Sequence, residues 1–217
     1  MNIEFFTACA AAALIGYLLG GVNAAIIMSR LIYGEDIREK GSGNPGFTNF
    51  KRVYGLGAVT WSVMLLDILK TAVPVCAAML IFGDMFGMGQ FGAAFTGLFG
   101  MLGHCFPVWY GFKGGKAFMA GFGTIWFVDW RMAVIATIVF LILLFTVKYM
   151  SVSACLASLA CPTALLFLGA ESVSVLVISA LSALLVVVRH KENFRRLLNG
   201  TESKFSFKHS ETSEKTE

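Results

Sequence analysis

Long apolar stretches separated by short polar segments make up most of this chain. A transmembrane helix needs about 20 mostly apolar residues, and stretches close to that length recur along the sequence. The pattern predicts spans at 4–28, 56–82, 86–106, 117–130, 132–147, 152–168 and 172–188. We therefore expect an all-α, polytopic integral membrane protein of about seven transmembrane helices.

The first apolar run, residues 3–28, has to be distinguished from a cleaved signal peptide. A signal peptide begins with a basic region, whereas Glu4 is the only charged residue before Arg30. The run is also long enough to cross a bilayer. We expect it to be a retained first helix.

The fourth stretch is short for a span, so the distribution of charge has to decide the count. If all seven stretches cross, segments 30–52, 107–116 and 148–151 share one side with the tail from Arg189. These four segments carry 15 of the 17 Lys and Arg residues. The positive-inside rule then places the N-terminus outside and the C-terminus in the cytoplasm. Without the fourth span, Lys148 and the basic tail would face outward, which favours seven.

Composition agrees with a lipid environment. Hydrophobic residues make up 57% of the chain and charged residues 14%, whereas a soluble domain has about 25% charged residues. The length of 217 residues predicts one membrane domain, 1–204, and a polar, flexible cytoplasmic tail, 205–217. The five cysteines lie in apolar stretches without metal-ligand spacing, so we expect small buried side chains and no metal site.

Two charged residues, Asp67 and Lys70, fall inside the second predicted span. A lone charge at mid-membrane costs about 2.5–3.5 kcal/mol on insertion scales. Residues three apart share a helix face, so the two charges can neutralise each other. The sequence supports two roles for this pair equally: an ion pair inside the helix bundle, or a polar support beneath an active site.

The first of three polar segments on the basic side is GSGNPGFTN at 41–49, followed by Arg52. Gly and Asn tolerate positive φ, so the backbone N–H groups can turn toward one point and form an anion site. Ser42 and Thr48 add hydroxyl donors, and Arg52 adds a fixed fork of donors. Taken alone, such a segment is more often an ordinary polar turn.

The second segment consists of GHCFP at 103–107 and FKGGK at 112–116. It is not a nucleotide-binding P-loop, because Tyr110 stands where the first Gly belongs and Ala117 where Ser or Thr belongs. Two lysines on a glycine turn at the start of a helix suit a phosphate. A pair of membrane-anchoring lysines is the plainer interpretation.

The third segment, RHKEN at 189–193, directly follows the last predicted span. As a helix it places His190 and Asn193 on one face. The basic residues Arg195 and Arg196 are expected to contact lipid headgroups. That role explains His190 and Asn193 less well.

Together the three segments resemble the motifs of the bacterial acyl-phosphate:glycerol-3-phosphate acyltransferase family. The likeness runs from the first predicted helix to about Lys204, with the motifs in order on one membrane side. It implies a seven-helix enzyme of the bacterial plasma (inner) membrane whose active site faces the cytoplasm. It also implies transfer of a fatty acyl group from acyl phosphate to glycerol-3-phosphate, giving lysophosphatidic acid and inorganic phosphate without a cofactor. That reaction is the first acylation of phospholipid synthesis.

The resemblance also assigns site residues. It implies catalytic roles for Ser42, Asn44, Lys116, His190 and Asn193, and substrate binding by these together with Gly43, Thr48, Arg52, Gly114, Gly115 and Ser151. Arg52 and Lys116 would bind the glycerol phosphate. Ser42, Gly43 and Ser151 would bind the acyl phosphate.

By the same resemblance, His190 and Asn193 would orient the attacking hydroxyl or contact a phosphate. The proton acceptor stays open between His190 and a phosphate oxygen of the donor. The family commonly has Gly after Gly-Gly-Lys, where this chain has Ala117, so the backbone course of the loop is also open.

Two other classes of protein agree less well with this sequence. Acyltransferases that carry His followed by Asp five residues later are disfavoured, because no histidine here has that partner. A small transporter or permease for an anionic solute is the non-enzyme alternative. Transporters place polar residues near the midplane and often show inverted repeats, whereas the polar motifs of this chain lie in loops on one membrane side. The expected partners are glycerol-3-phosphate, acyl phosphate and membrane lipid, with no nucleic acid.

Overall fold

The computed structural model describes residues 3–206, and every regular element in that range is helical. Its ten α-helices are α1 (Ile3–Gly20), α2 (Ala24–Tyr33), α3 (Phe47–Tyr54), α4 (Ala58–Phe86), α5 (Gly89–Cys105), α6 (Phe118–Val128), α7 (Trp130–Thr146), α8 (Met150–Leu168), α9 (Val173–Arg189) and α10 (Lys191–Leu198). Short 3-10 turns, η1 (Ile37–Glu39) and η2 (Val108–Tyr110), lie in two of the connections. The expected all-α fold is confirmed for the described residues.

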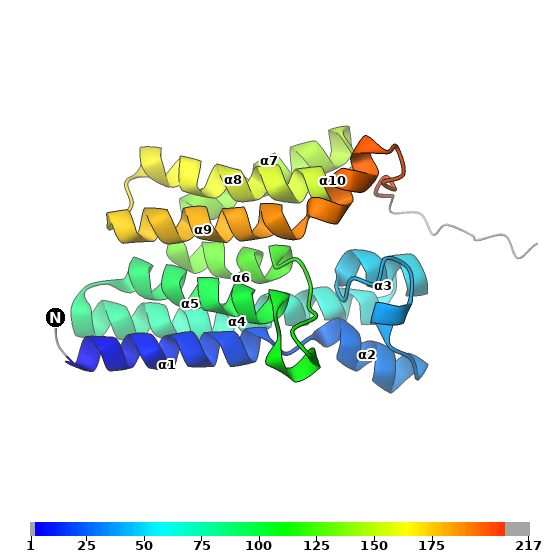
Figure 1. The fold of residues 1–217 in the computed structure, drawn as a ribbon. Helices are drawn as coiled ribbons and strands as arrows, with labels where there is room; N and C mark the ends of the chain where they lie inside the picture. The colour runs from blue at the N-terminus through cyan, green and yellow to red at the C-terminus, as the bar shows by residue number, and fades with distance from the viewer. Residues whose placement is uncertain (1–2, 207–217) are drawn as a thin grey trace, which may run out of the picture.

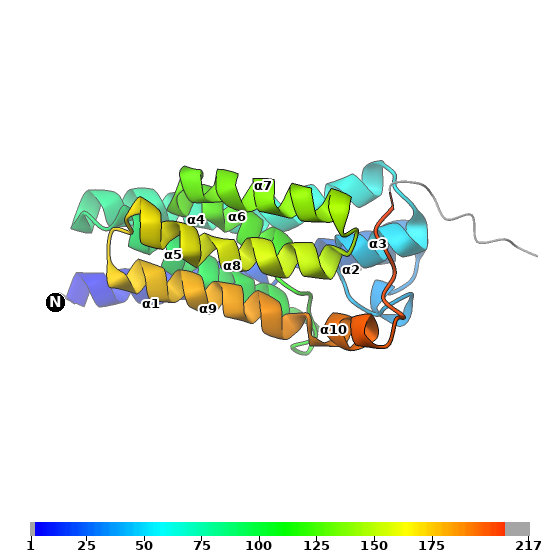
Figure 2. The same cartoon turned by 90° about the horizontal axis from the view of Figure 1, so that it is seen from above.

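The apolar helices form one elongated bundle (Figures 1 and 2). Helices α1, α4, α5, α6, α7, α8 and α9 run along its length, and α2, α3 and α10 gather at one end. Helix α5 is central, because it packs against α1, α4, α6 and α9. The seven lengthwise helices correspond in position to the seven predicted spans.

Glycines bring α1 and α5 into backbone contact. A Cβ added at Gly20 would lie 2.2 Å from the carbonyl oxygen of Gly100, and one added at Gly103 would lie 2.0 Å from that of Tyr17. Only glycine fits at such distances, as in other closely packed membrane helices.

The predicted first span, 4–28, is not one continuous helix. Helix α1 ends at Gly20 and α2 begins at Ala24. Asn23 caps α2, since its side chain accepts a hydrogen bond from the N–H of Ile26 at 2.9 Å. A capping asparagine thus ends a run that apolar composition alone would continue.

Length and hydropathy identify four candidate spans among residues 3–206: 3–33, 58–86, 89–110 and 150–168. A fifth is counted if α9 and α10, bent by 48° at His190, form one span. Helix α7 has 17 residues and α6 has 11. Helix α6 therefore rises only about 16 Å, roughly half of the hydrocarbon thickness of about 30 Å.

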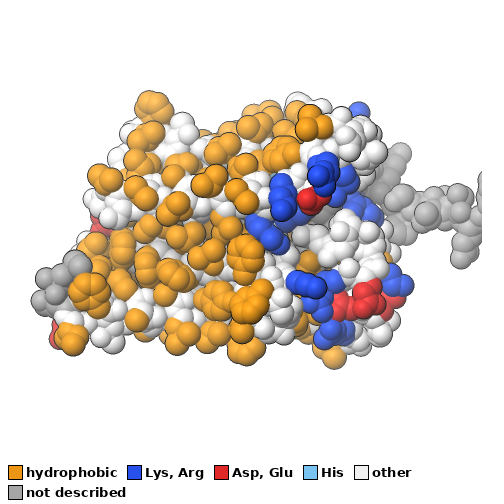
Figure 3. Space-filling model, viewed as in Figure 1, with side chains coloured by type: hydrophobic (Ala, Val, Ile, Leu, Met, Phe, Trp, Pro, Cys, Tyr) orange, Lys and Arg blue, Asp and Glu red, His pale blue; other side chains and the backbone are white. Residues whose placement is uncertain are grey.

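The short α6 shapes the charged end of the molecule. Figure 1 shows that α6 begins well short of the end at which α3 lies. The connection between α5 and α6 therefore enters the bundle before α6 begins. On the face drawn in Figure 3, the Lys and Arg side chains gather at this end and hydrophobic side chains cover most of the rest.

Candidate active site

A polar cavity of about 420 Å³ opens at the charged end of the bundle. Among the predicted site residues, it is lined by Ser42, Asn44, Thr48, Arg52, Lys116, Ser151, His190 and Asn193. These side chains come from the loop before α3, from α3, from the start of α6 and from the ends of α8, α9 and α10 that face this cavity. Segments far apart in the chain therefore meet around one space.

Three predicted site residues, Gly43, Gly114 and Gly115, are not among the residues that line the cavity. The N–H of Gly43 donates to the carbonyl of Lys40 at 2.9 Å. The N–H groups of Gly114 and Gly115 donate to carbonyls at the end of α5, at 3.2 and 3.0 Å. The N–H of Gly43 thus closes its own turn, and substrate binding by these three glycines stays a prediction.

Asn49 holds the first polar loop in shape. Its buried side chain accepts from the N–H of Ser42 at 2.8 Å and donates to the carbonyl of Lys40 at 3.0 Å. Gly41, with φ of +57°, has no room for a Cβ, which would lie 2.4 Å from Oδ1 of Asn49. The loop thus folds around Asn49, and Ser42 is left on the cavity wall.

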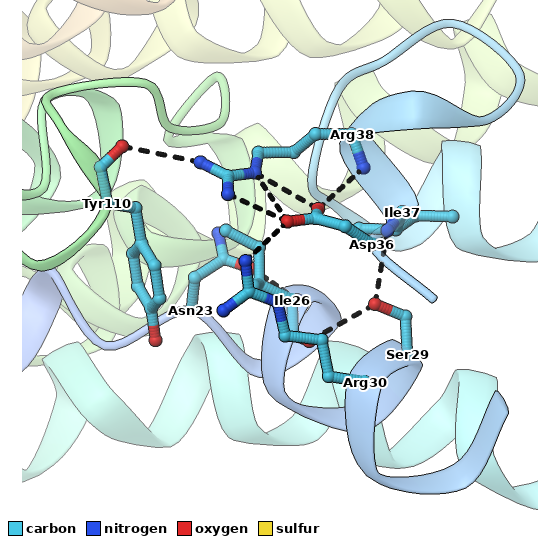
Figure 4. Close-up of polar contacts among 8 residues, drawn as sticks. All are labelled: Asn23, Ile26, Ser29, Arg30, Asp36, Ile37, Arg38 and Tyr110. Atoms are coloured by element: carbon cyan, nitrogen blue, oxygen red, sulfur yellow. Dashed lines mark hydrogen bonds and ion pairs between the residues drawn. The ribbon is translucent and has the colours of Figure 1, made fainter. Parts of the chain in front are cut away.

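Figure 4 shows a second set of contacts that joins this region to the loop before Lys116. Asp36 accepts from Arg30 at 2.7 Å and from Arg38 at 2.7 Å. The Arg38 guanidinium, which is the largest influence, and that of Arg30 hold the pKa of Asp36 well below its usual range. Arg38 also donates to the carbonyl of Tyr110 at 3.3 Å. A hydrogen bond therefore joins the segment that contains Arg38 to the loop before Lys116.

Arg189, the last residue of α9, also holds the loop before α6. Its guanidinium donates to the carbonyls of Gly115 and Gly114 at 3.1 and 3.0 Å. Ala117 adopts φ of +60°, a left-handed conformation that costs a non-glycine residue about 1–2 kcal/mol. Its methyl group is fully buried in an apolar cluster with Met101 and Ala120, and this packing offsets part of the strain.

Lys116 lies within this turn, two residues before α6 begins at Phe118. Its ammonium donates to Oδ1 of Asn193. Burial, which is the largest influence, and the positive charge of Arg196 together lower the pKa of Lys116 to about 8. A partly buried cation beside a helix N-terminus is suited to bind an anion that restores its charge balance.

His190 lies at the bend between α9 and α10, with 5% of its surface exposed. Its Nδ1 is 2.8 Å from the carbonyl oxygen of Val186. A carbonyl only accepts, so Nδ1 carries the hydrogen and Nε2 keeps its lone pair. Burial lowers the pKa of His190 to about 4, which keeps the ring neutral near pH 7. The cavity thus contains an imidazole nitrogen that can accept a hydrogen bond.

Comparison with known proteins identifies the family. A family model described as "Glycerol-3-phosphate acyltransferase" matches residues 10–200. The chain belongs to the glycerol-3-phosphate acyltransferase family. The match includes all three polar segments and each of the eight predicted residues that line the cavity.

Individual members of the glycerol-3-phosphate acyltransferase family are similar over nearly their whole length. One from Rhizobium etli (strain CIAT 652) is 41% identical over 201 residues, covering 91% of this chain and 92% of the relative. One from Francisella tularensis subsp. holarctica (strain OSU18) is 37% identical, covering 88% and 90%. A solved structure is also similar: the crystal structure of PlsY, an integral membrane glycerol 3-phosphate acyltransferase, in its glycerol 3-phosphate form. It superposes with a TM-score of 0.81 at 34% identity, covering 91% of this chain and 96% of that chain. Its lysophosphatidic acid form gives 0.78 at 32%, covering 92% and 96%. The chain is therefore an integral membrane protein of this family.

Several charged residues of this family member line the cavity although they were not predicted as site residues, among them Lys51, Arg196, Glu202 and Lys204. Arg196, expected to contact lipid headgroups, instead lines the cavity and pairs with Glu202 at 2.7 Å. Glu202 also accepts from Asn193 at 2.6 Å and from Ser151 at 3.3 Å. Despite burial, these hydrogen bonds lower the pKa of Glu202. Gly200, with φ of +68°, turns the chain back, and a glycine after a helix is the signal that could have indicated this return.

The segment after Gly200 closes part of the cavity. Arg52 donates to the hydroxyl of Ser203 at 2.8 Å. The ammonium of Lys51 lies 4.2 Å from the ring centre of Phe205, and the N–H of Phe205 donates to the carbonyl of Lys148 at 2.6 Å. Phe205, predicted to begin a flexible tail, therefore contacts α3 and the connection between α7 and α8. Residues 207–217 of that predicted tail lie outside the described residues.

The ion pair predicted from spacing on α4 is confirmed. The ammonium of Lys70 lies 2.8 Å from Oδ1 of Asp67, and both side chains are buried. Asp67 lines the cavity, as does His104 of α5. His104 is part of the second motif but was given no role of its own by the sequence.

Proposed function

We propose that this protein acylates glycerol-3-phosphate with a fatty acyl group taken from an acyl phosphate. The observation that carries the proposal is the position of Lys116, at the start of α6 inside a cavity that also holds His190 and Asn193. Relatives and solved structures named for glycerol-3-phosphate acylation support the acceptor. The acyl phosphate donor is supported by the motif pattern and by a cavity rich in cations and hydroxyl groups.

The reaction needs no protein nucleophile, because an acyl phosphate is a mixed anhydride and already activated. The glycerol-3-phosphate hydroxyl forms a new bond to the acyl carbon, and the bond from that carbon to the phosphate oxygen breaks. Both substrates are anions, so the main task of the protein is to hold two phosphates side by side. Lys116 and Arg52 supply positive charge for this, while Ser42, Asn44, Thr48 and Ser151 are polar groups that line the same cavity.

His190 orients the attacking hydroxyl in this proposal. Its Nε2 lone pair can accept the hydroxyl hydrogen bond, because Nδ1 is occupied by the carbonyl of Val186. A pKa of about 4 makes it a weak base. We therefore assign the proton to a phosphate oxygen of the donor, so that it leaves with inorganic phosphate. The acyl transfer then balances without a cofactor.

An apolar groove next to the cavity is the proposed site of the acyl chain. It runs between α6, α7, α8 and α9, and its lining includes Ile125, Met132, Phe140 and Val186. Phe118, the first residue of α6, lines both this groove and the polar cavity. A substrate with its chain in the groove would therefore present its acyl carbon near Lys116.

The decisive experiment uses purified protein in lipid vesicles with palmitoyl phosphate and glycerol-3-phosphate. We expect release of inorganic phosphate and formation of lysophosphatidate in equal amounts. Palmitoyl-CoA in place of palmitoyl phosphate tests the donor. Transfer from the CoA ester but not from the acyl phosphate would contradict the proposed donor, and no transfer from either would contradict the activity.

We further propose that all seven lengthwise helices cross the bacterial plasma membrane, with the cavity facing the cytoplasm. The concentration of Lys and Arg at one end supports this orientation. In a cysteine-free background, Glu39→Cys, Lys113→Cys and Asn199→Cys, all at exposed positions, should be shielded from an impermeant thiol reagent in intact cells. Asp84→Cys, exposed at the opposite end, should react and is the control. External labelling of any of the first three would contradict the orientation.

Activity is expected to fall as the pH rises through about 8. Lys116 binds phosphate as an ammonium, and burial lowers its pKa to about 8, so the charge is lost above that value. The pH profile of kcat/KM for glycerol-3-phosphate, which reports groups of the free enzyme, should show this decline. Lys116→Arg should move the decline upward, because a guanidinium stays protonated. A wild-type profile that stays flat through this range would contradict the role of Lys116.

A further inference from the structure

Three buried polar side chains lie under the cavity, where α4 meets α5. The side chains of Asp67, Lys70 and His104 are 2%, 9% and 4% exposed. Burying an ion pair is costly and does little for stability by itself. Its presence beside a ligand cavity therefore calls for a function other than packing.

The ammonium of Lys70 lies within 2.8 Å of three acceptor atoms. These acceptors are Oδ1 of Asp67 at 2.8 Å, the carbonyl oxygen of Val22 at 2.7 Å and Nδ1 of His104 at 2.8 Å. The carbonyl of Val22 is available because α1 and α2 are separated there, and Asn23 takes the N–H of Ile26. The break in the first span thus supplies one of the three acceptors.

This arrangement determines the tautomer of His104. An ammonium can only donate, so Nδ1 of His104 must be the acceptor and the ring hydrogen must be on Nε2. His190 has the opposite arrangement, since its Nδ1 donates to a backbone carbonyl. The cavity therefore has one neutral imidazole that donates through Nε2 and another that accepts through Nε2.

The donating nitrogen of His104 lies directly under the turn that carries Lys116. A Cβ added at Gly115 would lie 2.1 Å from Nε2 of His104, so only a glycine allows the turn to pass this close to the nitrogen. Within residues 3–206, no acceptor is hydrogen-bonded to Nε2, and the ring lines the cavity. Nε2 is not one of the fully buried side-chain atoms that lack a partner, so it is open to the cavity, where a ligand oxygen can accept its hydrogen.

Resting on the function proposed above, we propose that His104 is a further substrate-binding residue, whose Nε2–H donates to a phosphate oxygen. The acceptor belongs to glycerol-3-phosphate or to the acyl phosphate, which share this chemistry. Lys70 and Asp67 are a positioning pair that holds the imidazole in its donating tautomer. A neutral donor adds a bond to phosphate without repelling Lys116.

The first test compares His104→Phe, which keeps a ring, with His104→Gln, which keeps a donor near the Nε2 position. His104→Phe should raise KM about 10-fold for the substrate whose phosphate it contacts, and His104→Gln should restore part of that loss. Varying each substrate at saturating levels of the other identifies which phosphate is bound. Thr96→Val, a buried change of similar volume on the same helix and away from the cavity, should leave both KM values unchanged.

The second test examines the positioning pair through the ring itself. Nitrogen-15 NMR of labelled histidine, assigned with His104→Gln, should show the Nε2–H tautomer and a shift of that signal on adding inorganic phosphate. The paired variant Asp67→Leu/Lys70→Met removes both charges together and should lose the tautomer preference. Adding it to His104→Phe should raise KM no further, because the pair acts through His104.

The outcomes separate this inference from the proposed function. Unchanged KM values for both substrates in a folded His104→Phe, or an Nδ1–H tautomer in the wild type, would overturn the role of His104 while leaving the acyl transfer intact. If His104→Phe does not fold, as judged by thermal unfolding, the same readings are made on His104→Gln and on the paired variant. A wild type that makes no lysophosphatidate would overturn the function and this inference with it.

Discussion

Replacing Lys116 with methionine is expected to lower kcat/KM for glycerol-3-phosphate by about 10- to 100-fold, which corresponds to the loss of one charge-assisted hydrogen bond of about 1.5–3 kcal/mol. The ammonium is partly buried and lies at the start of α6, so water screens it less than a surface lysine. Methionine keeps the length and suits an apolar environment. Steady-state release of phosphate from palmitoyl phosphate measures the effect.

The matched control for this change lies three residues earlier on the same loop. Lys113 is exposed and does not line the cavity, so Lys113→Met should retain nearly wild-type kinetics. Thermal unfolding of both variants separates lost chemistry from lost structure. Equal, small effects at the two positions would mean that Lys116 is only one of several membrane-facing charges.

The second large effect is expected at the bend between α9 and α10. His190→Ala and Asn193→Ala should each reduce kcat/KM by about 10-fold or more, because each removes a hydrogen-bonding group from the cavity wall. Asn193 also joins Lys116 to Glu202, so its loss displaces the cation as well. The same phosphate-release assay provides the measurement.

Neighbouring charges on α10 provide the comparison. Lys191 and Arg195 are exposed and absent from the cavity lining, so their alanine variants should mainly weaken lipid contact, worth about 1 kcal/mol per charge near an anionic surface. The four variants should therefore fall into two classes. A uniform, mild decline in all four would show that this segment is only a membrane anchor.

The positions of the membrane helices follow largely from the sequence, because a bilayer requires long apolar stretches and disfavours unpaired charges within them. Apolar length predicted the positions of the lengthwise helices, and the spacing of Asp67 and Lys70 predicted their ion pair. The helices and the ion pair depend on composition and on local geometry, both of which a sequence displays directly. The site residues were assigned by the family resemblance of the three polar segments, and eight of the eleven line one cavity.

What the sequence could not reveal depends on how the backbone turns. A one-residue bend at His190 places Arg196 on the cavity. The N–H of Gly43 is used within its own loop, which composition cannot indicate. The role of His104 depends on a carbonyl exposed by the break after α1, a feature that apolar continuity concealed.

Phe118 borders both the polar cavity and the apolar groove, and this position has a consequence for how the two substrates are measured. Glycerol-3-phosphate arrives dissolved in water. An acyl phosphate is held in the bilayer by its chain, where each buried CH₂ group contributes about 0.8 kcal/mol. The two Michaelis constants are therefore quantities of different kinds: one is a concentration in the aqueous phase, and the other is a mole fraction among lipids.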